Sequence, residues 1–103
     1  MALPPPVAPT NLAAVVQGGG PPSANAVTLS WFASLTSSVV GYNVYRSVVS
    51  GSGFVRLNPS LVTVLTFTDT TVQSGTTYYY VVTAVGPTGV ESGFSNQAAA
   101  VIP

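Results

Sequence analysis

Hydrophobic and polar positions alternate along much of this chain with a period of two residues. Every second residue of "VTLSW" (27–31) is apolar, ending at Trp31, and in "YNVYR" (42–46) Tyr42 and Val44 alternate with their neighbours. This alternation, in runs rich in β-branched and aromatic residues, is typical of β-strands. No window has the period of 3.6 residues that indicates an amphipathic helix.

Turn-forming residues divide the chain into short segments of this kind. "QGGGPPSAN" (17–25) and "GPTGVESG" (86–93) are the clearest breaks. Seven short strands joined by turns predict an all-β fold, a seven-stranded antiparallel Greek-key sandwich of two sheets. The expected strands are 10–16, 26–32, 40–47, 53–57, 64–68, 77–85 and 95–102, with a weaker candidate at 61–63.

The amino-terminal segment differs from the rest in its proline content. Four of the nine prolines fall within residues 1–9, "MALPPPVAP". Proline fixes φ, so such a segment is extended and stiff. We therefore expect residues 1–9 to form a proline-rich linker or arm and residues 10–103 to form one domain. The segment lacks a basic region and a long apolar region, so we expect no signal peptide in this chain.

Three consecutive tyrosines occur in "GTTYYYVVTAVG" (75–86). If Tyr78 points into the sandwich, so does Tyr80, and Tyr79 then points outward. Tyr78 follows the turn-like "QSGTT" (73–77) and is the candidate for a tyrosine corner, in which the hydroxyl bonds to upstream backbone. The expected structural core includes Trp31, Tyr42, Tyr78 and Tyr80.

In order and spacing, these segments resemble the fibronectin type III domain, in the form common in bacterial secreted and surface proteins. "PTNLAA" is similar to the first strand, "VTLSW" to the second with its core tryptophan, and "GYNVYRS" to the third. "TFTDTTVQSGTTYYYVVTAVG" resembles the E strand, corner and F strand, and "ESGFSNQAAAVIP" resembles the closing strand. A tryptophan on the second strand and the absence of cysteine favour this family over immunoglobulin domains, which place tryptophan between two bridged cysteines.

Charged residues are scarce: Arg46, Arg56, Asp69 and Glu91 give a net charge of zero. A chain without net positive charge is not attracted to a phosphate backbone, so we expect no nucleic-acid partner. Uncharged stretches are interrupted before eighteen apolar residues accumulate, so we expect no membrane insertion. We expect the two arginines to keep the surface soluble, Asp69 to accept hydrogen bonds from the turn or from neighbouring threonines, and Glu91 to be a solvated loop residue.

Residue types suited to catalysis are also few. The chain has no histidine, cysteine or lysine, which leaves Asp69 and Glu91. These two flank the expected strand 77–85, about 25 Å long, whereas a glycosidase pair lies within about 5–10 Å. Two acids are also too few for a protein calcium site. We expect no enzyme activity, with no catalytic residue, metal or cofactor.

One face of the expected sandwich is unusually apolar. If the third, sixth and seventh strands are neighbours, as the family resemblance implies, six side chains share the outer side of their sheet, where a soluble sheet ordinarily shows polar residues. We interpret this side as a candidate protein-docking face for another protein, a neighbouring domain or a second copy. The alternative is an apolar surface without a function. The six residues are Tyr45, Tyr79, Val81, Val85, Ala99 and Val101.

Three functions fit these observations. The first is a non-catalytic structural or interaction module that spaces, decorates or docks within a larger extracellular, cell-surface or virion assembly, as part of a secreted bacterial protein or as a virion component. The second is an accessory carbohydrate-binding module of a secreted polysaccharide-degrading enzyme, for which Tyr45 and Tyr79 are the candidate aromatic rings. The third is an engineered binding scaffold, but the loops "ASLTSS" and "GPTGVES" show no randomised character.

Overall fold

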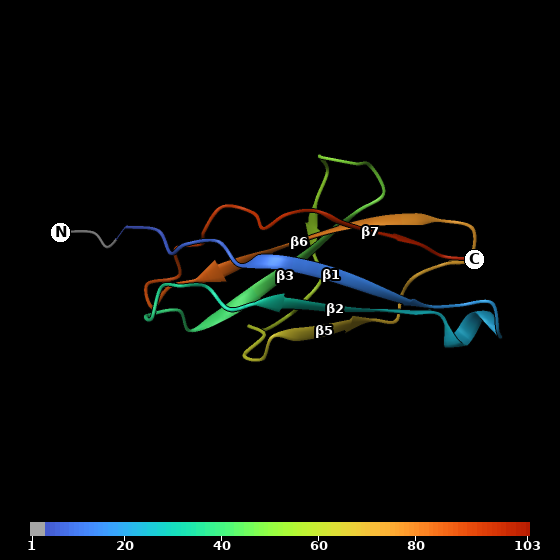
Figure 1. Ribbon diagram of the computed structural model, residues 1–103, viewed down its shortest axis with the longest axis horizontal. Coiled ribbons are helices and arrows are strands. Elements are labelled where there is room, and N and C mark those ends of the chain that lie inside the picture. The colour runs from blue at the N-terminus through green and yellow to red at the C-terminus, as the bar shows by residue number, and fades with distance from the viewer. Residues whose placement is uncertain (1–3) are drawn as a thin grey trace.

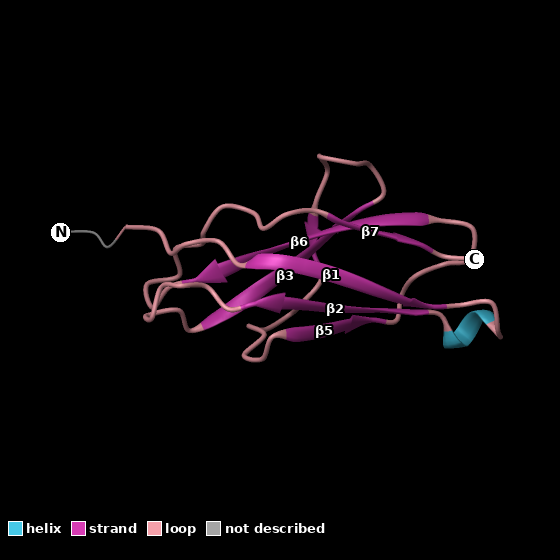
Figure 2. Ribbon diagram, in the orientation of Figure 1, coloured by secondary structure: helices cyan, strands magenta, loops and turns pink. Residues whose placement is uncertain are grey.

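The computed structural model describes residues 4–103 as two antiparallel β-sheets packed face to face (Figure 1). A short 3₁₀ turn lies in the first connection (Figure 2). The seven-stranded sandwich expected from the alternation is confirmed. One sheet has the order β1 (Thr10–Gln17), β2 (Ala26–Phe32), β5 (Thr66–Asp69), and the other β4 (Val55–Arg56), β3 (Gly41–Ser47), β6 (Thr77–Val85), β7 (Ala98–Val101); the 3₁₀ turn η1 is Pro22–Ala24.

The observed strand bounds agree with the predicted bounds in some strands and differ in others. β2 and β6 begin and end where predicted, whereas β4 and β7 are shorter than expected. Beyond β4, the side-chain oxygen of Asn58 accepts the backbone N–H of Val44 at 2.8 Å, in place of a backbone partner. The weaker candidate 61–63 forms an isolated bridge between Val62 and Tyr42.

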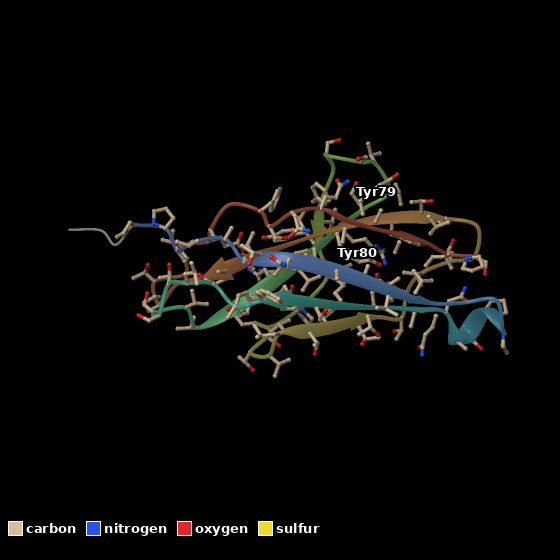
Figure 3. All side chains as sticks on the ribbon, in the orientation of Figure 1. Tyr79 and Tyr80 are labelled. Atoms are coloured by element: carbon tan, nitrogen blue, oxygen red, sulfur yellow. The ribbon has the colours of Figure 1, made fainter. Side chains whose placement is uncertain are left out.

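The three tyrosines of β6 take the expected sides of the sheet. Tyr78 and Tyr80 are buried in the core between the layers. Figure 3 shows Tyr79 on the other side of the strand from Tyr80, where it is half-buried. The Tyr78 hydroxyl accepts the backbone N–H of Gln73 at 2.9 Å, which is the predicted tyrosine corner. Trp31 is also buried, with its ring centroid 5.6 Å from that of Tyr42 in an edge-to-face arrangement.

A charged cluster joins the two sheets inside the sandwich. Asp69, at the end of β5, is 4% exposed and accepts hydrogen bonds from the Tyr80 hydroxyl at 2.7 Å and from Arg46 Nη1 at 2.9 Å. The hydroxyl and backbone N–H of Thr71 donate to its other oxygen, which confirms the expectation for Asp69. Arg46 is not a purely solvating surface residue, because its guanidinium also lies 4.8 Å from the Tyr78 ring centroid.

Burial and hydrogen bonding act in opposite directions on this cluster. Burial acts to raise the pKa of Asp69, but the hydrogen bonds from Thr71, Tyr80 and Arg46 outweigh it, and the net pKa lies below its usual value. Burial, followed by the hydrogen bond to Asp69, raises the pKa of Tyr80 far above its usual value. The folded domain therefore holds a charged carboxylate beside a neutral phenol.

We expect the domain to lose stability in acid through Asp69. Its pKa is lower in the folded state than in the unfolded chain, where it is about 3.9. The stabilisation is therefore complete above about pH 4 and is lost as the pH falls through the folded value. Urea denaturation as a function of pH measures this loss, and Asp69→Asn should flatten the acid limb. An equal slope in the variant would show that other groups cause the loss.

The two described ends of the chain lie at opposite ends of the long axis (Figure 1). Residues 4–9 pack on the domain: Pro6 and Pro9 are buried, the backbone N–H of Val7 donates to Thr36 Oγ1 at 2.9 Å, and Ser34 Oγ donates to the carbonyl of Val7. At the other end, the backbone N–H of Ile102 donates to the carbonyl of Thr76. Within residues 4–103, no helix is long and apolar enough to span a membrane.

Candidate protein-docking face

The strand register brings all six predicted docking residues to one side of the larger sheet. Tyr45 pairs with Val81 across β3 and β6, and Tyr79 pairs with Ala99 across β6 and β7. Val85 and Val101 lie an even number of residues from these positions and so face the same side. The expected direction of each side chain is therefore observed.

Two of the six residues are nevertheless not on the surface. Val81 is 3% exposed and Val85 is 5% exposed, so the expectation that both belong to an open docking face is wrong. The connection between β6 and β7 folds two of its side chains, Glu91 and Phe94, onto this side of the sheet, where both contact Tyr45. Part of the apolar face is thus covered by the chain itself.

Glu91 is held against the sheet by hydrogen bonds. The Tyr45 hydroxyl lies 2.8 and 2.7 Å from the two carboxylate oxygens, and the Asn43 side-chain amide donates to one of them. Burial, then the hydrogen bond and the charge of Glu91, raise the pKa of Tyr45. Glu91 therefore fixes the β6–β7 connection to the outer face of the sheet. The expectation that it is a solvated loop residue is wrong.

Phe94 completes an aromatic cluster that the sequence analysis missed. Its ring centroid lies 5.5 Å from that of Tyr45 and 5.4 Å from that of Phe54. Phe94 lies in a connection without hydrophobic periodicity, so alternation gave no signal for it. A large aromatic residue between glycine and serine, as in "SGFSN", is the local feature that could have indicated a contact.

Two serines hold this connection beside β6. Ser95 Oγ accepts the backbone N–H of Val82 at 2.9 Å, and Ser92 Oγ accepts that of Ala84 at 2.8 Å. The backbone N–H of each serine donates to the carbonyl of the same β6 residue. The serines thus provide the hydrogen bonds that a longer β7 would provide, which is why β7 begins at Ala98 and not near residue 95.

The part of the face that stays open is small and uncharged. Ala99 is exposed, Val101 is 67% exposed, and Tyr79 is half-buried beside them. We call these three residues the β6–β7 patch, and their side chains can make apolar contacts.

The side-chain carboxylates of Asp69 and Glu91 lie on opposite sides of the larger sheet. Asp69 is bonded to the inner face and Glu91 to the outer face. The two carboxylates therefore do not form a facing pair.

Comparison with known proteins identifies the family. No protein-family model matches the chain. A solved structure, a Fn3-like protein from Clostridium thermocellum, is 39% identical and aligns over 95% of this chain and 94% of that chain with a TM-score of 0.80. The chain belongs to the fibronectin type III family.

Curated proteins similar to this fibronectin type III domain are amylopullulanases. The protein from Thermoanaerobacter thermohydrosulfuricus is 46% identical over 72% of this chain, and that from Thermoanaerobacterium thermosulfurigenes is 41% identical over 92% of it. The chain spans about 5% of the length of each. The likeness thus concerns a small segment of each of these much longer proteins.

Proposed function

We propose that this fibronectin type III domain is a non-catalytic accessory domain that spaces and docks neighbouring domains within a larger extracellular polysaccharide-degrading enzyme. The observation that carries this proposal is that the matching segments make up about 5% of each amylopullulanase. A domain of this size is one component of such a protein. The separation of Asp69 from Glu91 by the sheet supports a role without catalysis.

The positions of the chain ends support the spacing role. The chain leaves the domain at opposite ends of its long axis (Figure 1), and the molecule measures 51 × 24 × 22 Å. The hydrogen bonds of Val7 and Ile102 hold both exits on the body of the domain. Neighbouring domains would therefore be kept apart by a stiff element and not by a flexible tether.

The β6–β7 patch supports the docking role. Tyr79 combines a large apolar ring with a polar tip, and tyrosine is a frequent anchor of protein interfaces. Val101 and Ala99 extend the apolar surface beside it. A patch of this size fits a small contact between domains of one chain, where the linkage raises the effective concentration.

Two other settings receive less support. A carbohydrate-binding platform on Tyr45 and Tyr79 would need both rings open, but Tyr45 is bonded to Glu91 and covered by Phe94. The amylopullulanase relatives favour an enzyme over a virion or an engineered scaffold as the surroundings of the domain.

Tyr79→Ser combined with Val101→Thr should leave the domain folded and weaken its contact with the adjacent domain by roughly tenfold or more, since interface tyrosines are often hot spots. The measurement is calorimetric titration of the domain with the separately expressed neighbouring domain, with circular dichroism to verify folding. Val15→Thr, an exposed residue on the other sheet, is the matched control. Equal affinity of the double variant and the control would rule out the patch as the contact.

A further inference from the structure

A shallow groove lies between the start of β1 and the connection that precedes β7. It has a volume of about 580 Å³. Pro9, Thr10 and Asn11 line one side, and Phe94, Ser95 and Asn96 line the other. None of these side chains is charged. The groove therefore suits a ligand that is neutral, polar at its edges and apolar on one surface.

The ring of Phe94 is a fixed platform in this groove. Phe94 is 53% exposed, while its ring packs on Tyr45 and Phe54 at centroid distances of 5.5 and 5.4 Å. Those contacts hold the ring, so little side-chain entropy remains to be lost when a ligand covers it. An aromatic ring that is rigid on one side and open on the other is suited to stacking.

Asn11 faces the groove from a strained backbone position. Its φ of 57° is left-handed, and it lies in the register shift of β1 between Thr10 and Ala13. The next residue is fixed, because the Asn96 amide accepts the N–H of Leu12 and donates to its carbonyl. Within residues 4–103 the Asn11 side chain makes no hydrogen bond. Bulges and left-handed residues of this kind often orient side chains at functional sites.

We propose that this groove binds a neutral oligosaccharide, with one pyranose ring stacked on Phe94 and its hydroxyls bonded to Thr10 and Asn11. A pyranose has the required chemistry, because its C–H face is apolar, its edges carry donors and acceptors, and it has no charge. The choice of a glucan rests on the proposed function in a polysaccharide-degrading enzyme. With one ring stacked in an open groove, the expected Kd is on the order of 1 mM.

Titration of the ¹⁵N-labelled domain with maltoheptaose, followed by amide chemical shifts, tests this site. Shifts confined to residues 8–12 and 93–97 are the expected result. Phe94→Leu keeps an apolar cover over Tyr45 but removes the flat ring, and should weaken binding at least tenfold. Asn11→Gly removes the amide at a position where glycine adopts φ of 57° freely, and should weaken binding severalfold. Val15→Thr should change nothing.

Three results would overturn the site: no shifts, shifts scattered over the domain, or unchanged affinity in Phe94→Leu. Binding of a neutral peptide in place of the sugar would overturn it as well. These failures can be told apart from failure of the proposed function. The domain–domain contact is measured with substitutions at Tyr79 and Val101, neither of which lines the groove.

Discussion

Asp69→Ala should lower the free energy of unfolding by about 2–4 kcal/mol, less than the full loss for a buried ion pair because the Arg46 side chain is 25% exposed to water. The substitution leaves the Arg46 guanidinium and the Tyr80 hydroxyl without their shared acceptor inside the sandwich. It also removes the acceptor of both Thr71 hydrogen bonds. Urea denaturation at neutral pH measures the change.

Two further variants separate the effect of the ion pair from that of a general change at this turn. Thr70→Ala, an exposed neighbour, should change stability by no more than about 0.5 kcal/mol. The double variant Arg46→Met/Asp69→Ala should be more stable than Asp69→Ala alone, because it removes the unpaired charge together with its partner. A loss of less than about 1 kcal/mol in Asp69→Ala would mean that the cluster contributes little to stability.

Ser92→Ala combined with Ser95→Ala should destabilise the domain by about 2–6 kcal/mol. Each substitution leaves a buried backbone N–H, that of Ala84 or Val82, without an acceptor, and a buried unsatisfied donor costs about 1–3 kcal/mol. The connection should also loosen, so that Glu91 and Phe94 lose their positions over the outer face.

Thermal and urea denaturation measure the stability of this double variant, and amide hydrogen exchange at Val82 and Ala84 reports the local opening. Ser60→Ala, at an exposed serine, is the matched control, with an expected change within about 0.5 kcal/mol. The prediction would be contradicted if the double variant were as stable as the control and both amides still exchanged slowly. A backbone carbonyl or a water molecule would then have replaced the serine hydroxyls as acceptor.

The strands and the core could be predicted because they depend on a local pattern. In β6 the period of two residues assigns Tyr78 and Tyr80 to one side and Tyr79 to the other, and one buried face makes any other register unfavourable. The same pattern fixes which side Val81 faces. It contains no information on what lies above Val81, because alternation describes directions within one sheet.

The remaining features depend on contacts between segments that have no periodicity. The contacts of Glu91 and Phe94 with Tyr45 on the outer face, and the early end of the β6–β7 ladder, both arise from "ESGFSN", where side chains replace strand hydrogen bonds. The bond from Arg46 to Asp69 joins two different sheets across 23 residues of sequence. The groove at Phe94 needs β1 beside this connection, a proximity visible only in the fold.

Because the two described chain ends lie at opposite ends of the long axis (Figure 1), their position also determines how the domain responds to tension. β1 and β7 run close to the long axis (Figure 1); β1 is paired with β2 from Ala13 to Gln17, and β7 is paired with β6. A pull on the two exits is therefore directed along the strands, and it loads the hydrogen bonds of each ladder in shear, many at once. Such a domain resists extension better than one whose strands peel apart bond by bond.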